Sequence, residues 1–226
     1  MFACITKEPP ITIPKHLAVI PDGNRRYSRR FFMNTVSGYK NSGESLQRLI
    51  NWSLDKGIRE LSIYAWSSEN WTRPQNEIDG AMEQFNTALD KWLTDDQKLI
   101  SFEFISTSIH KLSSTLRTKM HSLKMQTFPS EDTRLKVYIY VSYGFSEDVD
   151  RMSTGKYEFD SVIPNAMSEP DLLIRTSGEQ RLSNFCMWHL RYTELMFIRP
   201  LFPECDEEVW DSCLEEYSTR KRRYGK

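Results

Sequence analysis

The chain has 226 residues, of which 39% are hydrophobic and 27% charged, a composition typical of one soluble globular domain. Its formal net charge of −1 argues against a general nucleic-acid-binding surface, so an anion site would have to be built from local arginine clusters. The four cysteines form no C-x-x-C pair, which indicates free thiols in a reducing compartment rather than disulfides or a zinc cage. No run reaches the ~18 apolar residues that a transmembrane segment requires.

The N-terminal residues lack the apolar core of a signal peptide. We therefore expect a soluble protein, in the cytoplasm, or in the plastid stroma if an upstream transit peptide has been removed. No internal repeat or linker divides the chain. One domain over residues 1–226, with residues 1–15 as an N-terminal extension, is the expected organisation.

Hydrophobic periodicity predicts strands that alternate with helices along the chain. We expect strands over residues 17–20, 60–66, 100–105, 135–141, 171–175 and 194–198. We expect helices over residues 42–54, 77–93, 111–125 and 206–223, with Gly57 ending the first of them. Residues 143–170 show no clear long helix. The alternation predicts an α/β fold with a central, mostly parallel sheet flanked by helices, whose ligands bind beyond the carboxyl ends of the strands.

The segment IPDGNRRYSRR, residues 20–30, leaves the first predicted strand and should open a helix. Free N–H groups at a helix start attract anions, and Gly23 lets the backbone approach a phosphate closely. Four arginines add paired donors: Arg25, Arg26, Arg29 and Arg30. Asp22 would repel a phosphate unless a cation such as Mg²⁺ lies between them. The alternative is that Asp22 is a helix N-cap in front of a solvated basic face.

The segment SSENWTRP, residues 67–74, follows the second predicted strand and belongs at the same edge of the sheet. Ser67 and Asn70 offer neutral hydrogen-bonding groups, Arg73 offers a phosphate donor, and Trp71 offers an apolar wall. The alternative is an ordinary strand-to-helix loop with capping serines.

The segment DLLIRTSGEQRLSNF, residues 171–185, runs from a strand into a third polar loop that holds Arg175, Gly178, Arg181 and Ser183. Taken by itself, Arg175 would only be expected to form an ion pair with a surface carboxylate. Three arginine-bearing loops at strand ends together favour a shared phosphate site. Glu194 stands at the start of the last predicted strand. It is either a charged residue that keeps an edge strand from pairing with another chain or a metal ligand.

These residues resemble the cis-prenyltransferase family, which includes undecaprenyl diphosphate synthases and short-chain Z-prenyl synthases. The resemblance runs from His16 to Gly225. HLAVIPDGNRR, SSENWTRP, DLLIRTSGEQRLSNF and YTEL are similar to four separate signatures of the family, and RRYG at residues 222–225 is similar to its terminal tail. The family fold is a parallel sheet with an apolar substrate tunnel, and its members usually form homodimers.

The resemblance implies a magnesium-dependent enzyme that joins an allylic diphosphate to isopentenyl diphosphate with loss of pyrophosphate. It implies a metal site of Asp22 and Glu194, and it implies proton removal assisted by Ser67 and Asn70. It places the primer diphosphate on Gly23, Asn24, Arg25 and Arg26, and the extender diphosphate on Arg175, Arg181 and Ser183. It implies catalytic roles for Asp22, Asn24, Arg26, Ser67 and Asn70, and further substrate contacts from Tyr27, Thr35, Tyr39, Ser68, Glu69, Trp71, Arg73 and Arg223.

Several positions depart from the family pattern. Pro21 stands where an apolar residue is usual, Arg25 replaces a common glycine, and Ser177 replaces another. These changes crowd the primer side, and together with Trp66 they favour short products of about ten to fifteen carbons. The alternatives are an irregular, lavandulyl-type coupling of two dimethylallyl diphosphates and a non-catalytic partner subunit. No P-loop motif occurs, and no D-D-x-x-D motif of trans-type synthases.

Overall fold

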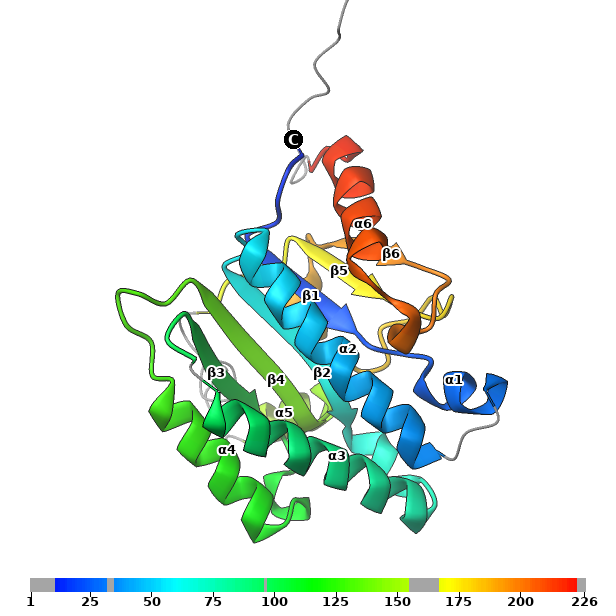
Figure 1. Ribbon diagram of the computed structural model, residues 1–226, viewed down its shortest axis with the longest axis vertical. Coiled ribbons are helices and arrows are strands. Elements are labelled where there is room, and N and C mark those ends of the chain that lie inside the picture. Colours follow the sequence, from blue (N-terminus) through cyan, green and yellow to red (C-terminus); the bar gives the residue numbers. More distant parts are fainter. Residues whose placement is uncertain (1–10, 32–34, 96, 155–166, 223–226) are drawn as a thin grey trace, which may run out of the picture.

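The computed structural model describes residues 11–31, 35–95, 97–154 and 167–222. Six strands form one sheet in the order β3-β4-β2-β1-β5-β6 (Figure 1), and every neighbouring pair is parallel. The strand bounds are β1 His16–Ile20, β2 Glu60–Ser67, β3 Ile100–Ile105, β4 Leu135–Tyr143, β5 Leu172–Arg175 and β6 Glu194–Phe197. All six predicted strands are present, and the predicted α/β fold is confirmed.

The helices connect these strands in the predicted alternation. Their bounds are α1 Asn24–Arg30, α2 Thr35–Asp55, α3 Gln75–Thr94, α4 Ser114–Gln126, α5 Phe145–Ser153 and α6 Glu207–Thr219. Short 3₁₀ helices cover η1 Ser68–Thr72, η2 Ile109–Lys111, η4 Met187–Leu190 and η5 Phe202–Glu204. None of the helices in the described ranges is long and apolar enough to cross a membrane.

Three predicted helix ends were wrong. Helix α2 begins at Thr35 rather than at residue 42. Helix α4 starts at Ser114 rather than at residue 111, because the Ser113 side chain accepts the Leu116 N–H at 3.2 Å and caps it there. Helix α6 is capped by Asp206, which accepts the Val209 N–H at 3.0 Å, and it ends at Thr219 rather than at residue 223. Gly57 ends α2 as predicted, with a positive φ of 78°.

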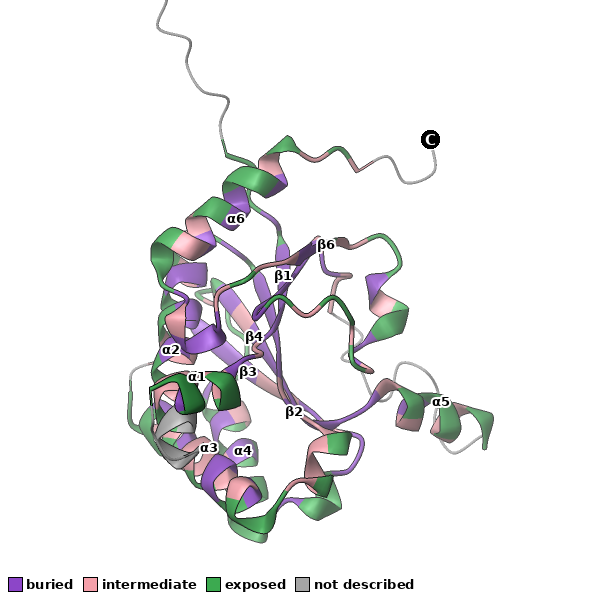
Figure 2. Cartoon of the chain, turned by 90° about the vertical axis from the view of Figure 1, so that its right-hand side faces the viewer, coloured by how far each residue is buried: buried purple, intermediate pink, exposed green. Residues whose placement is uncertain are grey.

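The two faces of the sheet are covered differently. Helices α2, α3, α4 and α6 pack on one face, and α5 and long loops lie on the other (Figure 2). The helix-covered face carries the larger apolar core, to which Leu17, Leu61 and Val137 contribute. The other face carries a smaller cluster dominated by aromatic rings, which comprises among others Tyr64, Tyr138, Tyr140, Tyr143 and Phe185.

The strand order brings the three polar loops together. Strand β1 lies between β2 and β5, and Ile20 at its carboxyl end pairs with Arg175 at the carboxyl end of β5. The register of β2 against β4 shifts at Ala65, and this irregularity turns Trp66 onto the helix-covered face, where its side chain is 4% exposed. The segments that follow β1, β2 and β5 therefore meet at one edge of the sheet.

Candidate functional site

A polar pocket of about 440 Å³ lies at this edge, between the three loops. Its lining includes eleven of the predicted site residues: Asp22, Gly23, Asn24, Arg25, Arg26, Ser67, Asn70, Arg73, Arg175, Arg181 and Ser183. The lining also includes Arg29 and Glu179. In the described part of the chain, six arginines and two carboxylates therefore line the pocket, so its charge favours an anion.

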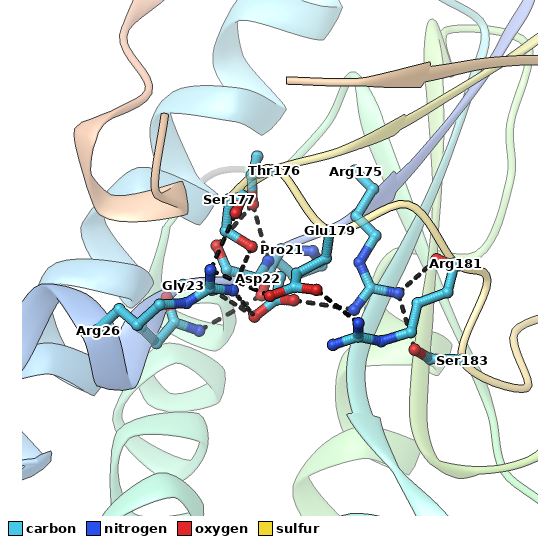
Figure 3. Close-up of polar contacts among 11 residues, drawn as sticks. Pro21, Asp22, Gly23, Arg26, Arg175, Thr176, Ser177, Glu179, Arg181 and Ser183 are labelled. Atoms are coloured by element: carbon cyan, nitrogen blue, oxygen red, sulfur yellow. Dashed lines mark hydrogen bonds and ion pairs between the residues drawn. The ribbon is translucent and has the colours of Figure 1, made fainter. Parts of the chain in front are cut away.

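Asp22 is held in place by both neighbouring loops. Its Oδ1 accepts the Gly23 N–H at 2.6 Å, and its Oδ2 accepts the Arg175 Nη2–H at 2.8 Å (Figure 3). The Thr176 hydroxyl donates to the Asp22 carbonyl at 2.6 Å and accepts its N–H at 2.8 Å. The N-cap of α1 is Gly23, without a side-chain cap. The alternative that Asp22 caps this helix is therefore wrong.

Gly23 occupies a position that other residues do not tolerate. Its φ is 107°, in the region that favours glycine, and a Cβ added there would lie 2.8 Å from Leu201 Cδ2. The Phe202 N–H donates to the Asp22 carbonyl at 3.0 Å and holds the two segments together. The loop therefore turns sharply into α1 and leaves the Asp22 carboxylate at the pocket.

Arg175 is the buried cation of the site, with 5% of its side chain exposed. Its Nη1 donates to the Arg181 carbonyl and to Ser183 Oγ, and its Nη2 donates to Asp22. Burial alone would raise the pKa of Asp22, but the hydrogen bond and charge of Arg175 outweigh it and hold that pKa below its usual value. Asp22 is therefore ionised at neutral pH.

Arg26 reaches across the pocket from α1 to the loop after β5. Its Nη1 donates to the Ser177 carbonyl at 3.0 Å, and its Nη2 donates to Ser177 Oγ at 2.6 Å. Ser177 adopts a φ of 77°, which is strained for any residue with a Cβ. The same guanidinium lies 3.2 Å from a Glu179 oxygen and 3.4 Å from Asp22 Oδ1. The serine that replaces a family glycine therefore contributes a direct contact to Arg26.

A second, apolar pocket of about 100 Å³ adjoins the polar one. It lies between the sheet and helices α2 and α3, where Leu46, Met82 and Phe85 line it. The two pockets share four lining residues: Pro21, Asn24, Ala65 and Trp66. A polar site thus continues into an apolar one.

The loop after β2 contributes only part of its predicted residues to the pocket. Ser67 and Asn70 both line it, and they also cap η1 reciprocally, with the Asn70 side-chain oxygen accepting the Ser67 N–H at 3.2 Å. Arg73 lies over the Trp66 ring, 5.1 Å from its centre. Ser67 and Asn70 therefore cap η1, as in the alternative interpretation, and also line the pocket.

Four other predicted contacts lie outside the pocket lining. Trp71 packs against Trp66 and donates its Nε1–H to Ser142 Oγ at 2.8 Å, so it supports the loop from behind. Glu69 accepts a hydrogen bond from Asn184, and Ser68 is not part of the lining either. Tyr27 packs on Phe31. The substrate contacts expected of these four residues stay predictions, and none of the four lines the polar pocket in this structure.

Glu194 does not join Asp22 within the chain. It pairs with Leu172 at the amino ends of β6 and β5, whereas Asp22 follows the carboxyl end of β1. Arg220 Nη1 lies 3.3 Å from a Glu194 oxygen and donates to the Leu195 carbonyl at 2.9 Å. Within one chain the two carboxylates therefore lie at opposite edges of the sheet, and a metal site that includes both stays a prediction. Arg223 and the side chains of Thr35 and Tyr39 lie outside the described residues.

Sequence reasoning gave no site role to Glu179, which lines the pocket, or to Thr176 and Ser177, which hydrogen-bond to Asp22 and Arg26. They follow Arg175 directly in the segment TSGE, and the signal was Gly178, whose φ of 75° belongs to a turn. That turn sends the chain back over the pocket, where Glu179 contacts both Arg26 and Arg181.

The fold and the two pockets place an arginine-lined pocket next to an apolar one at the carboxyl edge of a parallel sheet, where α/β proteins bind their ligands. Residues 20–225 match the model of the undecaprenyl diphosphate synthase family. The chain therefore belongs to the cis-prenyltransferase family and is a prenyltransferase, which confirms the resemblance seen in its motifs.

Individual relatives agree with this membership. The chain is 35% identical to the ditrans,polycis-undecaprenyl-diphosphate synthase, (2E,6E)-farnesyl-diphosphate specific, of Xanthomonas campestris pv. campestris, over 94% of this chain and 88% of that protein. It is 31% identical to an isoprenyl transferase of Agrobacterium fabrum, over 95% and 93%. The crystal structure of lavandulyl diphosphate synthase from Lavandula x intermedia in complex with dimethylallyl diphosphate matches with a TM-score of 0.81 at 27% identity, over 94% and 98%.

Proposed function

We propose that this prenyltransferase condenses an allylic diphosphate with isopentenyl diphosphate to a short-chain Z-isoprenyl diphosphate and releases pyrophosphate. The observation that carries the proposal is the continuity of the arginine-lined pocket with the small apolar pocket through Pro21, Asn24, Ala65 and Trp66. A diphosphate fits the first pocket and a hydrocarbon chain the second, since burying each CH₂ contributes ~0.8 kcal/mol.

The size of the apolar pocket supports a short product. A protein cavity of ~150 Å³ binds benzene, with its six carbons. The apolar pocket here measures about 100 Å³, which suits roughly one five-carbon unit, and aromatic rings of Trp66 and Phe85 form part of its wall. A chain of eleven such units would need these walls to move.

The pocket residues suit the charge changes of the reaction. A carbon–carbon bond forms between the two substrates, the allylic carbon–oxygen bond breaks, and its electron pair leaves on pyrophosphate. Arg26, Arg175 and Arg181 are positioned to stabilise that charge without rearrangement. The extender then loses a proton, and we propose that Ser67 and Asn70 assist its removal, since both line the pocket.

We also propose that the substrates bind with Mg²⁺, a cation that proteins hold through one or two carboxylates plus substrate phosphates. Asp22 fits this role, because it is ionised and each of its oxygens uses only some of its lone pairs. The described residues contain no cluster of three or more His, Cys, Asp or Glu side chains suited to a metal. Diphosphate oxygens would therefore have to complete the coordination. The ion would neutralise charge on the departing pyrophosphate.

The surface around β6 supports a homodimer as a further part of the proposal. This strand is at the edge of the sheet, and its Leu195 is 36% exposed. The preceding segment exposes Met187, Trp188 and Tyr192 by 43%, 48% and 55%. A second copy of the chain would cover this apolar surface. Analytical ultracentrifugation should show a dimer of the wild-type protein. The Leu195→Glu variant should have a mass closer to that of the monomer. A wild-type protein that is monomeric at micromolar concentration would exclude the homodimer.

Irregular coupling of two dimethylallyl diphosphates is the second candidate. It is favoured by the similarity to lavandulyl diphosphate synthase, whose fold this chain matches with a TM-score of 0.81. The two candidates differ in whether isopentenyl diphosphate is needed.

The deciding experiment incubates the protein with Mg²⁺ and dimethylallyl diphosphate, with and without isopentenyl diphosphate, and identifies the alcohols after phosphatase treatment. We expect products of about ten to fifteen carbons only when isopentenyl diphosphate is present. A branched ten-carbon alcohol from dimethylallyl diphosphate alone would establish irregular coupling instead. Products of more than about twenty carbons would overturn the short-chain proposal.

A further inference from the structure

Glu179 bridges two arginines from different segments of the pocket, namely Arg26 in α1 and Arg181 in the loop after β5. One of its oxygens lies 3.2 Å from Arg26 Nη1, and the other forms an ion pair with Arg181 Nη1 (Figure 3). Arg26 belongs to the group proposed to hold the primer diphosphate, and Arg181 to the group proposed for the extender. Glu179 therefore contacts the binding groups of both substrates at once.

The two carboxylates of the pocket are held differently. Asp22 is fixed by the buried Arg175 and by a backbone N–H, and it is the residue proposed to bind the metal. Glu179 faces Arg26 and Arg181, whose side chains are 44% and 59% exposed, and it is itself 31% exposed. Its ion pairs are therefore weak enough to exchange, since exposed pairs contribute only ~0–1 kcal/mol each.

An incoming diphosphate would need the same donors. Guanidinium groups bind carboxylate and phosphate oxygens with the same paired geometry, and a bound diphosphate next to Glu179 would suffer like-charge repulsion. Before substrate arrives, Glu179 keeps both guanidinium groups over the pocket. After the reaction it offers them a partner as pyrophosphate leaves.

We propose that Glu179 is an internal competitor for the diphosphate, which holds Arg26 and Arg181 in place in the empty site and takes them back during pyrophosphate release. This inference rests on the proposed function, because it concerns the same diphosphate site. It predicts that the negative charge of Glu179 weakens anion binding and speeds its release.

The test compares Glu179→Gln with the wild-type protein. Glutamine keeps the size and the hydrogen-bonding oxygen of the side chain but removes its charge. The matched control is Glu169→Gln, which removes one charge from a surface ion pair with Arg191, close to the amino end of β5 and away from the pocket. Binding of inorganic pyrophosphate is measured by titration calorimetry in EDTA, so that a metal ligand role does not contribute. Steady-state product inhibition by pyrophosphate is then measured with Mg²⁺.

We expect Glu179→Gln to bind pyrophosphate about three- to tenfold more tightly than wild type, the range that one or two partly exposed ion pairs supply. Product inhibition should strengthen in the same proportion, KM for both substrates should fall, and kcat should fall with slower release. The Glu169→Gln control should match wild type in all of these.

Equal or weaker pyrophosphate binding by Glu179→Gln in EDTA would overturn the inference. So would a loss of affinity that occurs only with Mg²⁺, since it would make Glu179 a metal ligand. Failure of the proposed function would look different, because the wild-type protein itself would then neither bind pyrophosphate nor turn over prenyl diphosphates.

Discussion

Arg175 at the carboxyl end of β5 donates a hydrogen bond of 2.8 Å to the carboxylate of Asp22, which follows the neighbouring strand β1. The two residues are 153 positions apart in the chain, yet they form an ion pair. The buried guanidinium keeps Asp22 ionised, and the carboxylate gives the buried guanidinium its counter-charge.

Replacing Asp22 with Asn should reduce kcat at least a hundredfold, because charge stabilisation at the leaving group is lost. It should also reduce the free energy of unfolding at pH 7 by about 1–2 kcal/mol, because Arg175 loses its counter-charge, with allowance for the partial exposure of Asp22. The folded-state pKa of Asp22 is lowered, so its stabilisation is fully present above the unfolded pKa of about 3.9 and is lost progressively as the pH falls from there through the lower folded-state pKa. Denaturation of both proteins at pH 7 and at several pH values below about 3.9 checks this; a stability difference that did not shrink as the pH fell would contradict it.

Replacing Phe85 with Ala should enlarge the apolar pocket and lengthen the product by about one five-carbon unit. Phe85 lines this pocket and packs edge-to-face on Phe104, which does not line it. Phe104→Ala is therefore the matched control, since it disturbs the same ring pair without opening the pocket. Chromatography of the dephosphorylated products measures the outcome. Identical product lengths in both variants would show that this pocket does not limit the chain.

Replacing Ser177 with Gly should leave stability within about 1 kcal/mol of wild type. Relief of the strained φ of 77° offsets the loss of the hydroxyl contact to Arg26, and each effect amounts to ~1 kcal/mol. The KM for the allylic substrate should rise several-fold, because Arg26 is less firmly held.

The companion variant Ser177→Ala separates these two effects, because it removes the hydroxyl but keeps the strain. It should therefore be about 1 kcal/mol less stable than Ser177→Gly in urea denaturation, with a similar KM. Equal stability of the two variants would show that the backbone at this position is not strained.

Replacing Gly23 with Ala should destabilise the protein by at least 2 kcal/mol, roughly the left-handed backbone cost plus a steric clash. The added Cβ would meet Leu201 Cδ2 at 2.8 Å. Gly57→Ala is the control, because Gly57 also has a positive φ, of 78°, but no atom lies within 4 Å of the added Cβ. This variant should lose only the stability that the left-handed backbone costs, ~1 kcal/mol. Thermal unfolding of both variants measures the difference. Equal losses of stability in the two variants would mean that Leu201 moves aside at little cost.

Replacing Asp148 with Asn should stabilise the protein at pH 8 but not at pH 4. Burial raises the pKa of Asp148 to about 6, although the nearby Tyr143 hydroxyl and the charge of Arg151 oppose the shift. The wild-type protein therefore loses stability as the pH rises from about 4 through 6, by roughly 1–2 kcal/mol after allowance for solvent screening. The quantity to measure is the difference in unfolding free energy between variant and wild type, at several pH values. A constant difference would contradict the raised pKa.

The strands could be predicted because buried parallel strands are continuous apolar runs, such as LAVI at residues 17–20, and local sequence is enough to recognise them. The polar loops could be predicted because each one directly follows such an apolar run in the sequence. Eleven of the expected residues line one pocket. The sequence by itself thus determined the fold class, the family and most of the lining of the polar pocket.

Only the tertiary structure decided the positions of residues that depend on strand register and on the path of the chain through turns. The pairing of Glu194 with Leu172 separates Glu194 from Asp22, although both lie in family motifs. The shift at Ala65 turns Trp66 into the apolar pocket, and the turn at Gly178 brings Glu179 between Arg26 and Arg181. These relationships join residues far apart in the chain, and their distances follow from strand order and packing, which local residue patterns do not encode.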